Sequence, residues 1–141
     1  MQRKISLKDA INFHGHLGPY LVLGLLAGEL ALNKLKLKKY FGIEVKVWGA
    51  SKKPKSCLID GLQLSTGATY GKGNIYKYNG SAVRVDFKSK ETGNALSIRL
   101  NKDLIKKLDS LKTHADSENF AQELYAGRLK GFSQYIITTT Y

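Results

Sequence analysis

The sequence has little cysteine, few acidic residues and no hydrophobic run long enough to cross a membrane. Its only cysteine, Cys57, excludes a disulfide within the chain and is typical of a reducing compartment. The longest strongly apolar run, residues 17–28, is too short to span a bilayer. Residues 1–4 lead into a polar amphipathic segment and not into the apolar core of a signal peptide. We therefore predict a cytoplasmic protein without membrane contact.

Internal repeats, low-complexity segments and linkers are also missing. With 141 residues, of which 43% are hydrophobic, the chain has the composition of one globular domain, residues 1–141, that can bury a core of its own. Lysine and arginine outnumber acidic residues by 23 to 11, which gives a net charge of +12. This excess favours an acidic partner: nucleic acid, an anionic small molecule or an acidic protein. However, the lysines are spread along the chain, and no pattern of a known nucleic-acid-binding module accompanies them, so nucleic acid is the less favoured partner.

The first helices are predicted from their start signals. Ser6 is placed to cap a short helix that ends near Phe13, and Pro19 suits the first turn of a second helix over residues 20–37. The first half of that second helix is apolar on nearly every face, with leucines and Val22 around its circumference. A small domain can cover only part of such a helix, so the pattern predicts a homodimer built on it.

Alternating apolar residues and turn signals predict strands over the middle of the chain and at its end. Asn79 and Gly80 form a strong hairpin signal between two of the strands, Ser56 is expected to cap a helix through residue 65, and Asn101 a later one through residue 112. The predicted strands are residues 43–48, 75–78, 82–87, 95–100 and 135–139, and a last helix covers residues 117–130 and stops at Gly131. This order predicts an α+β fold with a mainly antiparallel sheet.

Two histidines are candidates for metal binding or proton chemistry. His14 and His16 flank Gly15 in a turn between two predicted helices, where both rings could converge. Such a turn has few packing duties, although the rings could also simply cap carbonyl groups at the end of the first helix. The third histidine, His114, lies in a polar stretch and is expected to be solvated.

Cys57 lies at the predicted start of a helix, where unpaired N–H groups favour a thiolate with a lowered pKa. Asp60 and Gln63 follow at intervals of three residues and share its helix face. The alternative is a small buried cysteine beside an ordinary first-turn acid. Residues 67–74 form a glycine-rich loop that lacks the P-loop spacing but could bring Lys72 to a small anion.

Three ordered motifs resemble the E-subunit family of formylmethanofuran dehydrogenase. They are Phe-His-Gly-His-Leu before a proline at residues 13–19, Cys-x-x-Asp-x-x-Gln at residues 57–63, and a Thr-, Gly- and Lys-containing loop at residues 66–74. The resemblance implies an α+β core that dimerises around a His/Cys-lined cavity for a metal or small ligand. Its candidate site residues are His14, His16, Cys57, Asp60, Gln63, Thr69 and Lys72.

Two departures from the family pattern bear on function. Gly18 occupies a position where the family usually has a cysteine, so one thiol is missing, and no cysteine follows Cys57 to form the C-terminal zinc finger of some members. We expect the core domain alone.

The leading functional hypothesis is a metal- or ligand-binding domain, serving as an accessory subunit or a minor enzyme. His14, His16 and Cys57 would hold the metal, with zinc as the default. Asp60 would orient a histidine or act as a base, Lys72 would meet an anionic group, and Gln63 and Thr69 would contact the ligand. The alternative is a basic interaction module for nucleic acid or an acidic protein, with a vestigial cavity.

Overall fold

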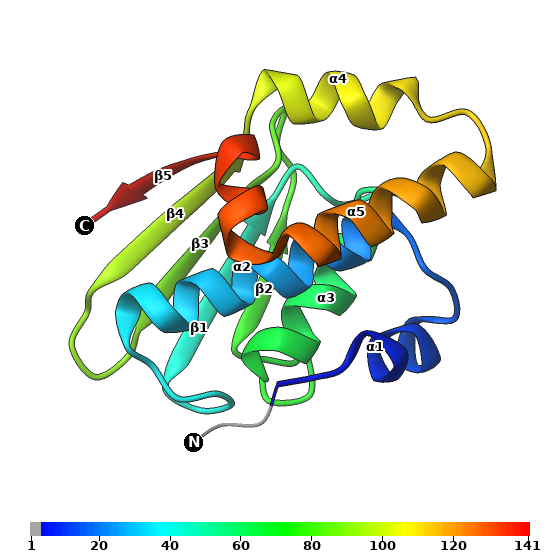
Figure 1. The fold of residues 1–141 in the computed structure, drawn as a ribbon. Helices are drawn as coiled ribbons and strands as arrows, with labels where there is room; N and C mark the ends of the chain where they lie inside the picture. Colours follow the sequence, from blue (N-terminus) through cyan, green and yellow to red (C-terminus); the bar gives the residue numbers. More distant parts are fainter. Residues whose placement is uncertain (1–3) are drawn as a thin grey trace.

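A five-stranded sheet with the order β2-β1-β3-β4-β5 forms one layer of the molecule (Figure 1). The structure is a computed structural model that describes residues 4–141, so most of the segment used to argue against a signal peptide lies outside it. The strands are β1 (Ile43–Trp48), β2 (Ile75–Tyr78), β3 (Arg84–Ser89), β4 (Ala95–Leu100) and β5 (Ile136–Thr140). Only β1 and β2 pair in parallel, so the predicted α+β fold with a mainly antiparallel sheet is confirmed.

Helices form the second layer against one face of the sheet (Figure 1). They are α1 (Leu7–His14), α2 (Pro19–Leu35), α3 (Cys57–Thr66), α4 (Lys102–Ser110) and α5 (His114–Phe132), with a short 3-10 turn, η1 (Ser133–Tyr135), before β5. Alternate residues of β1 are buried against these helices, namely Ile43, Val45 and Val47. In the part of the chain described, no helix is both long and apolar enough to cross a membrane.

Several helix ends agree with the sequence signals. The Ser6 hydroxyl accepts a hydrogen bond from the backbone N–H of Asp9 at 3.0 Å, and the Asn101 side chain accepts one from Leu104 at 2.9 Å. Other bounds differ by a few residues. Lys36 turns left-handed and ends α2 at Leu35, and Thr113 caps α5 three residues before the predicted start. Gly131 does not end α5, which instead breaks at Arg128 and resumes to Phe132.

The predicted hairpin at Asn79 and Gly80 is wrong, because β2 and β3 lie on opposite sides of β1. The chain crosses the end of β1 at this point. A Cβ on Gly80 would lie 3.2 Å from the backbone nitrogen of Gly49, and one on Gly49 would collide with the carbonyl of Ala82. The glycines therefore allow a close backbone crossing and not a two-residue turn.

Helix α2 is enclosed by its own chain. Its first ten residues are all buried, and Leu21, Val22 and Leu23 expose nothing to solvent. Helices α3 and α5 and the sheet supply the cover for which the sequence argument had required a second chain. The exposed apolar surface behind the dimer prediction is therefore absent from α2. The homodimer itself stays a prediction, and any interface would have to lie elsewhere.

Candidate metal centre

The two histidines lie on a tight turn at the end of α1. His14 is the last residue of that helix, and Gly15 follows it with a φ of 108°, which only glycine adopts without strain. The Gly15 N–H caps the helix by donating to the Ile11 carbonyl at 2.7 Å. Because the chain reverses here, the rings of His14 and His16 come together, with centroids 4.7 Å apart.

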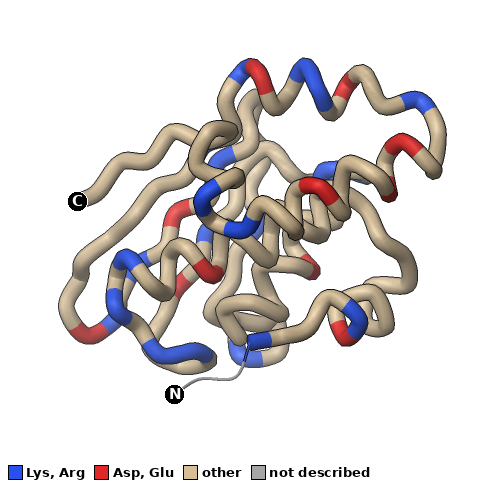
Figure 2. Tube along the Cα trace, in the orientation of Figure 1, with Lys and Arg blue, Asp and Glu red and all other residues tan. Residues whose placement is uncertain are grey.

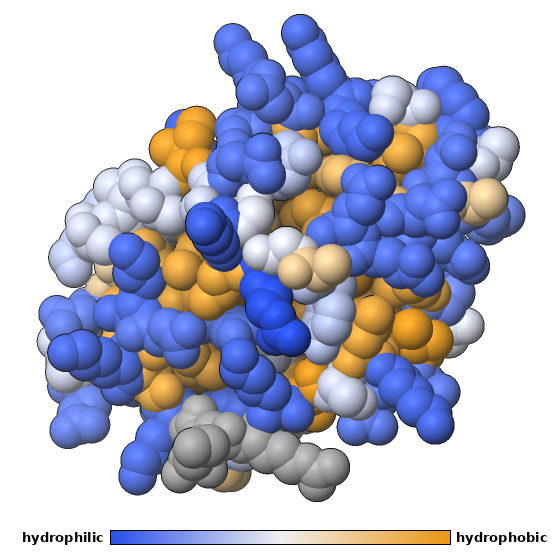
Figure 3. All heavy atoms as spheres, in the orientation of Figure 1, coloured by the Kyte–Doolittle hydropathy of each residue, from blue (hydrophilic) through white to orange (hydrophobic). Residues whose placement is uncertain are grey.

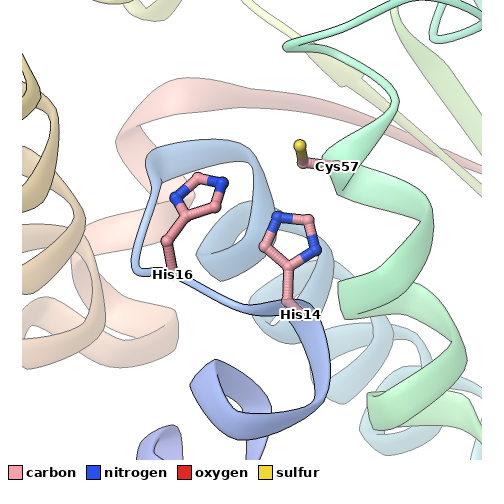
Figure 4. Close-up of side chains that lie close together, drawn as sticks. All are labelled: His14, His16 and Cys57. Atoms are coloured by element: carbon pink, nitrogen blue, oxygen red, sulfur yellow. The ribbon is translucent and has the colours of Figure 1, made fainter.

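Cys57 faces both histidine rings from the start of α3 (Figure 4). One nitrogen of each ring and the Cys57 sulfur all lie within 4.8 Å of one another. The predicted proximity of His14, His16 and Cys57 is therefore confirmed. Segments more than forty residues apart in sequence thus form one group of two nitrogen donors and one sulfur donor, which zinc binds well.

Asp60 fixes the orientation of the His14 ring. Its Oδ2 lies 2.6 Å from His14 Nδ1, while the other ring nitrogen, Nε2, is buried with no hydrogen-bond partner in the described residues. The carboxylate has no proton to donate, so Nδ1 carries the hydrogen and Nε2 keeps its lone pair. The His14 side chain is only 10% exposed, which makes an unpartnered nitrogen costly unless it gains a ligand.

The Cys57 thiol differs from the sequence expectation. Burial, followed by the negative charge of Asp60, raises its pKa, and Lys53 with a backbone hydrogen bond opposes this only in part. The expected helix-end effect is weak because Ser56 does not cap α3: it is itself helical in backbone conformation and makes no side-chain cap bond. The Cys57 N–H already donates to the carbonyl of Pro54 at 3.1 Å. The prediction of a lowered thiol pKa is thus wrong.

Backbone contact between α2 and α3 holds the two halves of the site together. A Cβ on Gly61 would collide with the Leu21 carbonyl and lie 2.9 Å from the Cα of Gly24, and one on Gly24 would meet Leu58 and Gly61 in the same way. Side chains at these positions would push the helices apart. The closeness of α2 and α3 therefore sets the distance between the histidine turn, which leads into α2, and Cys57, which begins α3.

Gln63, Thr69 and Lys72 lie toward the other end of α3. The Gln63 side chain accepts a hydrogen bond from the Tyr70 N–H at 3.1 Å, and the Thr69 hydroxyl accepts one from the Lys72 N–H at 3.1 Å. The Lys72 ammonium donates to the carbonyl of Gly67. Since Gly67 caps α3 ten residues after Cys57, Lys72 lies about 15 Å along the helix from the metal ligands. These residues support their own loop, and their ligand-contacting and catalytic roles stay predictions.

The sequence reasoning missed the residues that position the site. Gly24 and Gly28 are four residues apart on α2, a spacing of small residues that signals close helix packing, and it could have pointed to the contact with α3. Gly18 also borders the site: a Cβ there would lie 3.2 Å from Cε1 of His16. A side chain at position 18 would therefore occupy space beside the histidine ring.

The fold and this site together define a class of small α+β domain with a candidate His/Cys metal centre at the meeting of two helix ends. The chain belongs to the FmdE family, described as "FmdE, Molybdenum formylmethanofuran dehydrogenase operon", which it matches over residues 13–138. The family resemblance carried by the three motifs is thereby confirmed.

Two further proteins are similar to the chain. A curated protein of Archaeoglobus fulgidus, named "Probable S-adenosyl-L-methionine-binding protein", is 27% identical over 135 residues, which cover 93% of this chain and 32% of that protein. The chain thus spans about a third of the length of this relative. An FmdE-like protein of the tungsten formylmethanofuran dehydrogenase type, from Syntrophus aciditrophicus, has a crystal structure that superposes with a TM-score of 0.65 at 18% identity. The superposition covers 100% of this chain and 77% of that one. This likeness supports the fold.

Proposed function

We propose that the chain is a metal-binding domain that holds one divalent transition ion, zinc by default, through His14, His16 and Cys57. The domain would act as an accessory subunit or a minor enzyme, using the ion to hold a small ligand. A reducing, cytoplasmic compartment would keep the single thiol available as a ligand.

The observation that carries the proposal is the state of the His14 ring. Its Nδ1 is engaged by Asp60 at 2.6 Å, and its Nε2 is buried without a partner among the described residues, on the side of the other donors. A carboxylate behind a histidine is the usual support of a metal-binding imidazole, because it fixes the tautomer and makes the free nitrogen more basic. The metal would satisfy Nε2, which no described protein group does.

The donor spacing fits an ion after a small contraction. Tetrahedral zinc with bonds of about 2.0–2.3 Å holds its ligand atoms about 3.3–3.8 Å apart. The three donors lie within 4.8 Å of one another, so binding requires shifts of about 1 Å. His16 is exposed and begins no regular element, so its ring can make this adjustment.

Three protein ligands leave one position for water or a small ligand, which is the arrangement of catalytic rather than structural zinc sites. The space beside His16 that Gly18 leaves open is where we place that position. Asp60 would hold the proton on His14 Nδ1 throughout. The metal would acidify a bound water or polarise a bound oxygen, as such ions do.

The test is a cobalt and zinc titration of the reduced, metal-free protein. Cobalt should give the visible bands of a tetrahedral site and a thiolate charge-transfer band, and zinc should displace it at one equivalent. His14→Ala and Cys57→Ser should each lower zinc affinity by more than the roughly 10–100-fold that loss of an outer-shell partner causes. The charge-transfer band should vanish in Cys57→Ser.

His114→Ala is the matched control, because His114 is exposed on α5 and remote in sequence from the site. It should bind zinc as the wild type does. Equal zinc affinity in the wild type and Cys57→Ser would show that Cys57 is not a ligand. Octahedral cobalt spectra without a thiolate band would overturn the proposed donor set.

A second candidate function, a basic interaction module, is favoured by the sheet face opposite the helices. There Trp48 stacks on Tyr78 with ring centroids 5.0 Å apart, and the Arg84 guanidinium lies 4.1 Å from the Trp48 ring. Single-stranded nucleic acid binds such aromatic and cationic surfaces. Against it, lysines and arginines are distributed over helices, loops and strands and do not gather in one stripe (Figure 2).

Fluorescence anisotropy with a labelled single-stranded RNA tests this second function. Binding that weakens steeply between about 50 and 200 mM salt and is lost in Trp48→Ala would support it. Absence of binding at the lower salt would remove it.

A further inference from the structure

A pocket with a volume of about 150 Å³ lies toward the C-terminal ends of α2 and α3, at the far end of the helix pair from the histidines. Ser65 on its wall follows Cys57 by eight residues, which corresponds to about 12 Å along α3. The pocket is thus separate from the candidate metal centre. The face drawn in Figure 3 shows apolar atoms exposed in patches among long hydrophilic side chains.

The pocket combines apolar walls with a cationic rim. Leu25, Leu26, Leu32 and Leu37 line it together with the cations Lys39 and Arg128. A third cation, Lys4, contributes little to the balance because it pairs with Glu29 on the same wall at 2.5 Å. The two remaining cations make the rim attractive to an anion.

Lys39 is an unusual wall residue because its exposure is only 8%. Lysines are almost never so buried without a compensating neighbour, and burial here lowers the pKa of Lys39. The Tyr40 ring lies 5.5 Å from its ammonium. A bound anion would favour the charged form of Lys39 and so oppose the lowering.

Backbone strain is concentrated around this pocket. Within residues 4–141 the non-glycine residues with positive φ are Lys36, Tyr40 and Arg128, at 52°, 85° and 52°. Lys36 and Tyr40 bracket the segment that brings Leu37 and Lys39 to the pocket, and Arg128 lines it from the break in α5. Such conformations cost about 1–3 kcal/mol each and persist mainly at ligand clamps and other functional sites.

We propose that this pocket binds a small amphipathic anion, in which an aromatic or branched apolar group carries a carboxylate or a phosphate. An apolar cavity of about 150 Å³ holds a benzene ring. The leucine walls would therefore take the ring, while Lys39 and Arg128 hold the charged group at the rim. This inference is independent of the proposed metal function.

The experiment measures binding of benzoate and phenyl phosphate to the protein in a chelator, so that no metal-bound anion contributes. Methyl-selective NMR with assigned leucines should show shifts at Leu25, Leu32 and Leu37 for at least one of the two anions. The anion that binds more tightly identifies the charged group. Benzamide, which keeps the ring but has no charge, should bind at least about tenfold more weakly.

Lys39→Met should weaken binding of the preferred anion about tenfold, while Lys90→Met, an exposed lysine in the turn after β3, should leave it unchanged. Leu32→Phe fills the pocket without removing a charge, so it tests the site even if Lys39→Met fails to fold. Saturation below about 10 mM with these effects supports the proposal. Leucine shifts absent up to that concentration, equal binding of benzamide, or binding unaffected by Leu32→Phe would overturn it.

Discussion

The two ends of the α2–α3 helix pair differ in how their polar groups are arranged. At the N-terminal end, His14, His16 and Cys57 converge on a turn that Gly15 lets the chain make without strain, and a carboxylate behind them fixes one ring. At the C-terminal end, Lys39 and Arg128 are brought to an apolar pocket by backbone that is strained.

The difference indicates two kinds of site. Neutral nitrogen and sulfur donors around a buried nitrogen that no described group satisfies suit a metal ion, whereas spaced cations over leucine walls suit an anion with an apolar body. The same helix contact supports both, so changes to the helix pair should affect the two ends together, and changes to one end should leave the other intact.

The largest effect is expected from Gly61→Ala, which should damage both ends. Its methyl group would collide with the Leu21 carbonyl of α2, and overpacking of this kind costs about 1–3 kcal/mol. We expect a loss of unfolding free energy near the upper end of that range, together with weaker zinc and weaker anion binding. Urea unfolding and the two titrations measure this.

Gly127→Ala is the matched control for that change. Gly127 also lies in a helix, but a Cβ there meets no atom within 4 Å. Alanine should therefore leave both sites unaltered and stabilise the helix by up to about 1 kcal/mol. Similar losses in both variants would mean that close helix contact is not what positions the sites.

Asp60→Asn should affect only the metal end. The asparagine keeps the size of the side chain but loses the charge that fixes the proton on His14 Nδ1. Loss of such an outer-shell partner typically lowers metal affinity about 10–100-fold. Zinc competition with a chromophoric chelator measures the change, and binding of the anion at the other end should stay the same. An unchanged zinc affinity would contradict the role given to Asp60.

The sequence was most informative where a local signal decides the structure. The caps by Ser6 and Asn101 and the left-handed end of α3 at Gly67 each involve residues within a few positions of one another. The grouping of histidines and cysteine, although distant in sequence, followed from chemistry that few other residues in the chain could supply.

Long-range packing decided the remaining features, and no local pattern could report it. Asn79 and Gly80 have the composition of a hairpin turn, yet the chain crosses β1 there because β1 takes the position between β2 and β3. Lys72 follows a glycine-rich loop, yet its ammonium binds Gly67 at the far end of α3. The raised pKa of Cys57 likewise depends on burial, which only the folded chain defines.

Metal affinity should rise with pH at one end only. Because burial and Asp60 raise the pKa of Cys57, the free thiol is protonated at neutral pH and zinc must displace that proton. While the thiol remains protonated, apparent affinity should rise about tenfold per pH unit, which is roughly 1.4 kcal/mol. Zinc titrations at successive pH values test this; in Cys57→Ser this slope should be lost.

The smallest expected effect concerns the strain at Arg128. Its φ of 52° and ψ of −155° favour glycine, so Arg128→Gly should relieve strain that Arg128→Ala retains. Both variants lose the guanidinium and should weaken anion binding alike. The glycine variant should nevertheless be more stable than the alanine variant by about 1 kcal/mol, since strain relief exceeds the greater chain entropy of glycine. Urea unfolding measures the difference. If alanine proved the more stable, the backbone at position 128 would not be strained, and the pocket would lose one of the observations that mark it as a binding site.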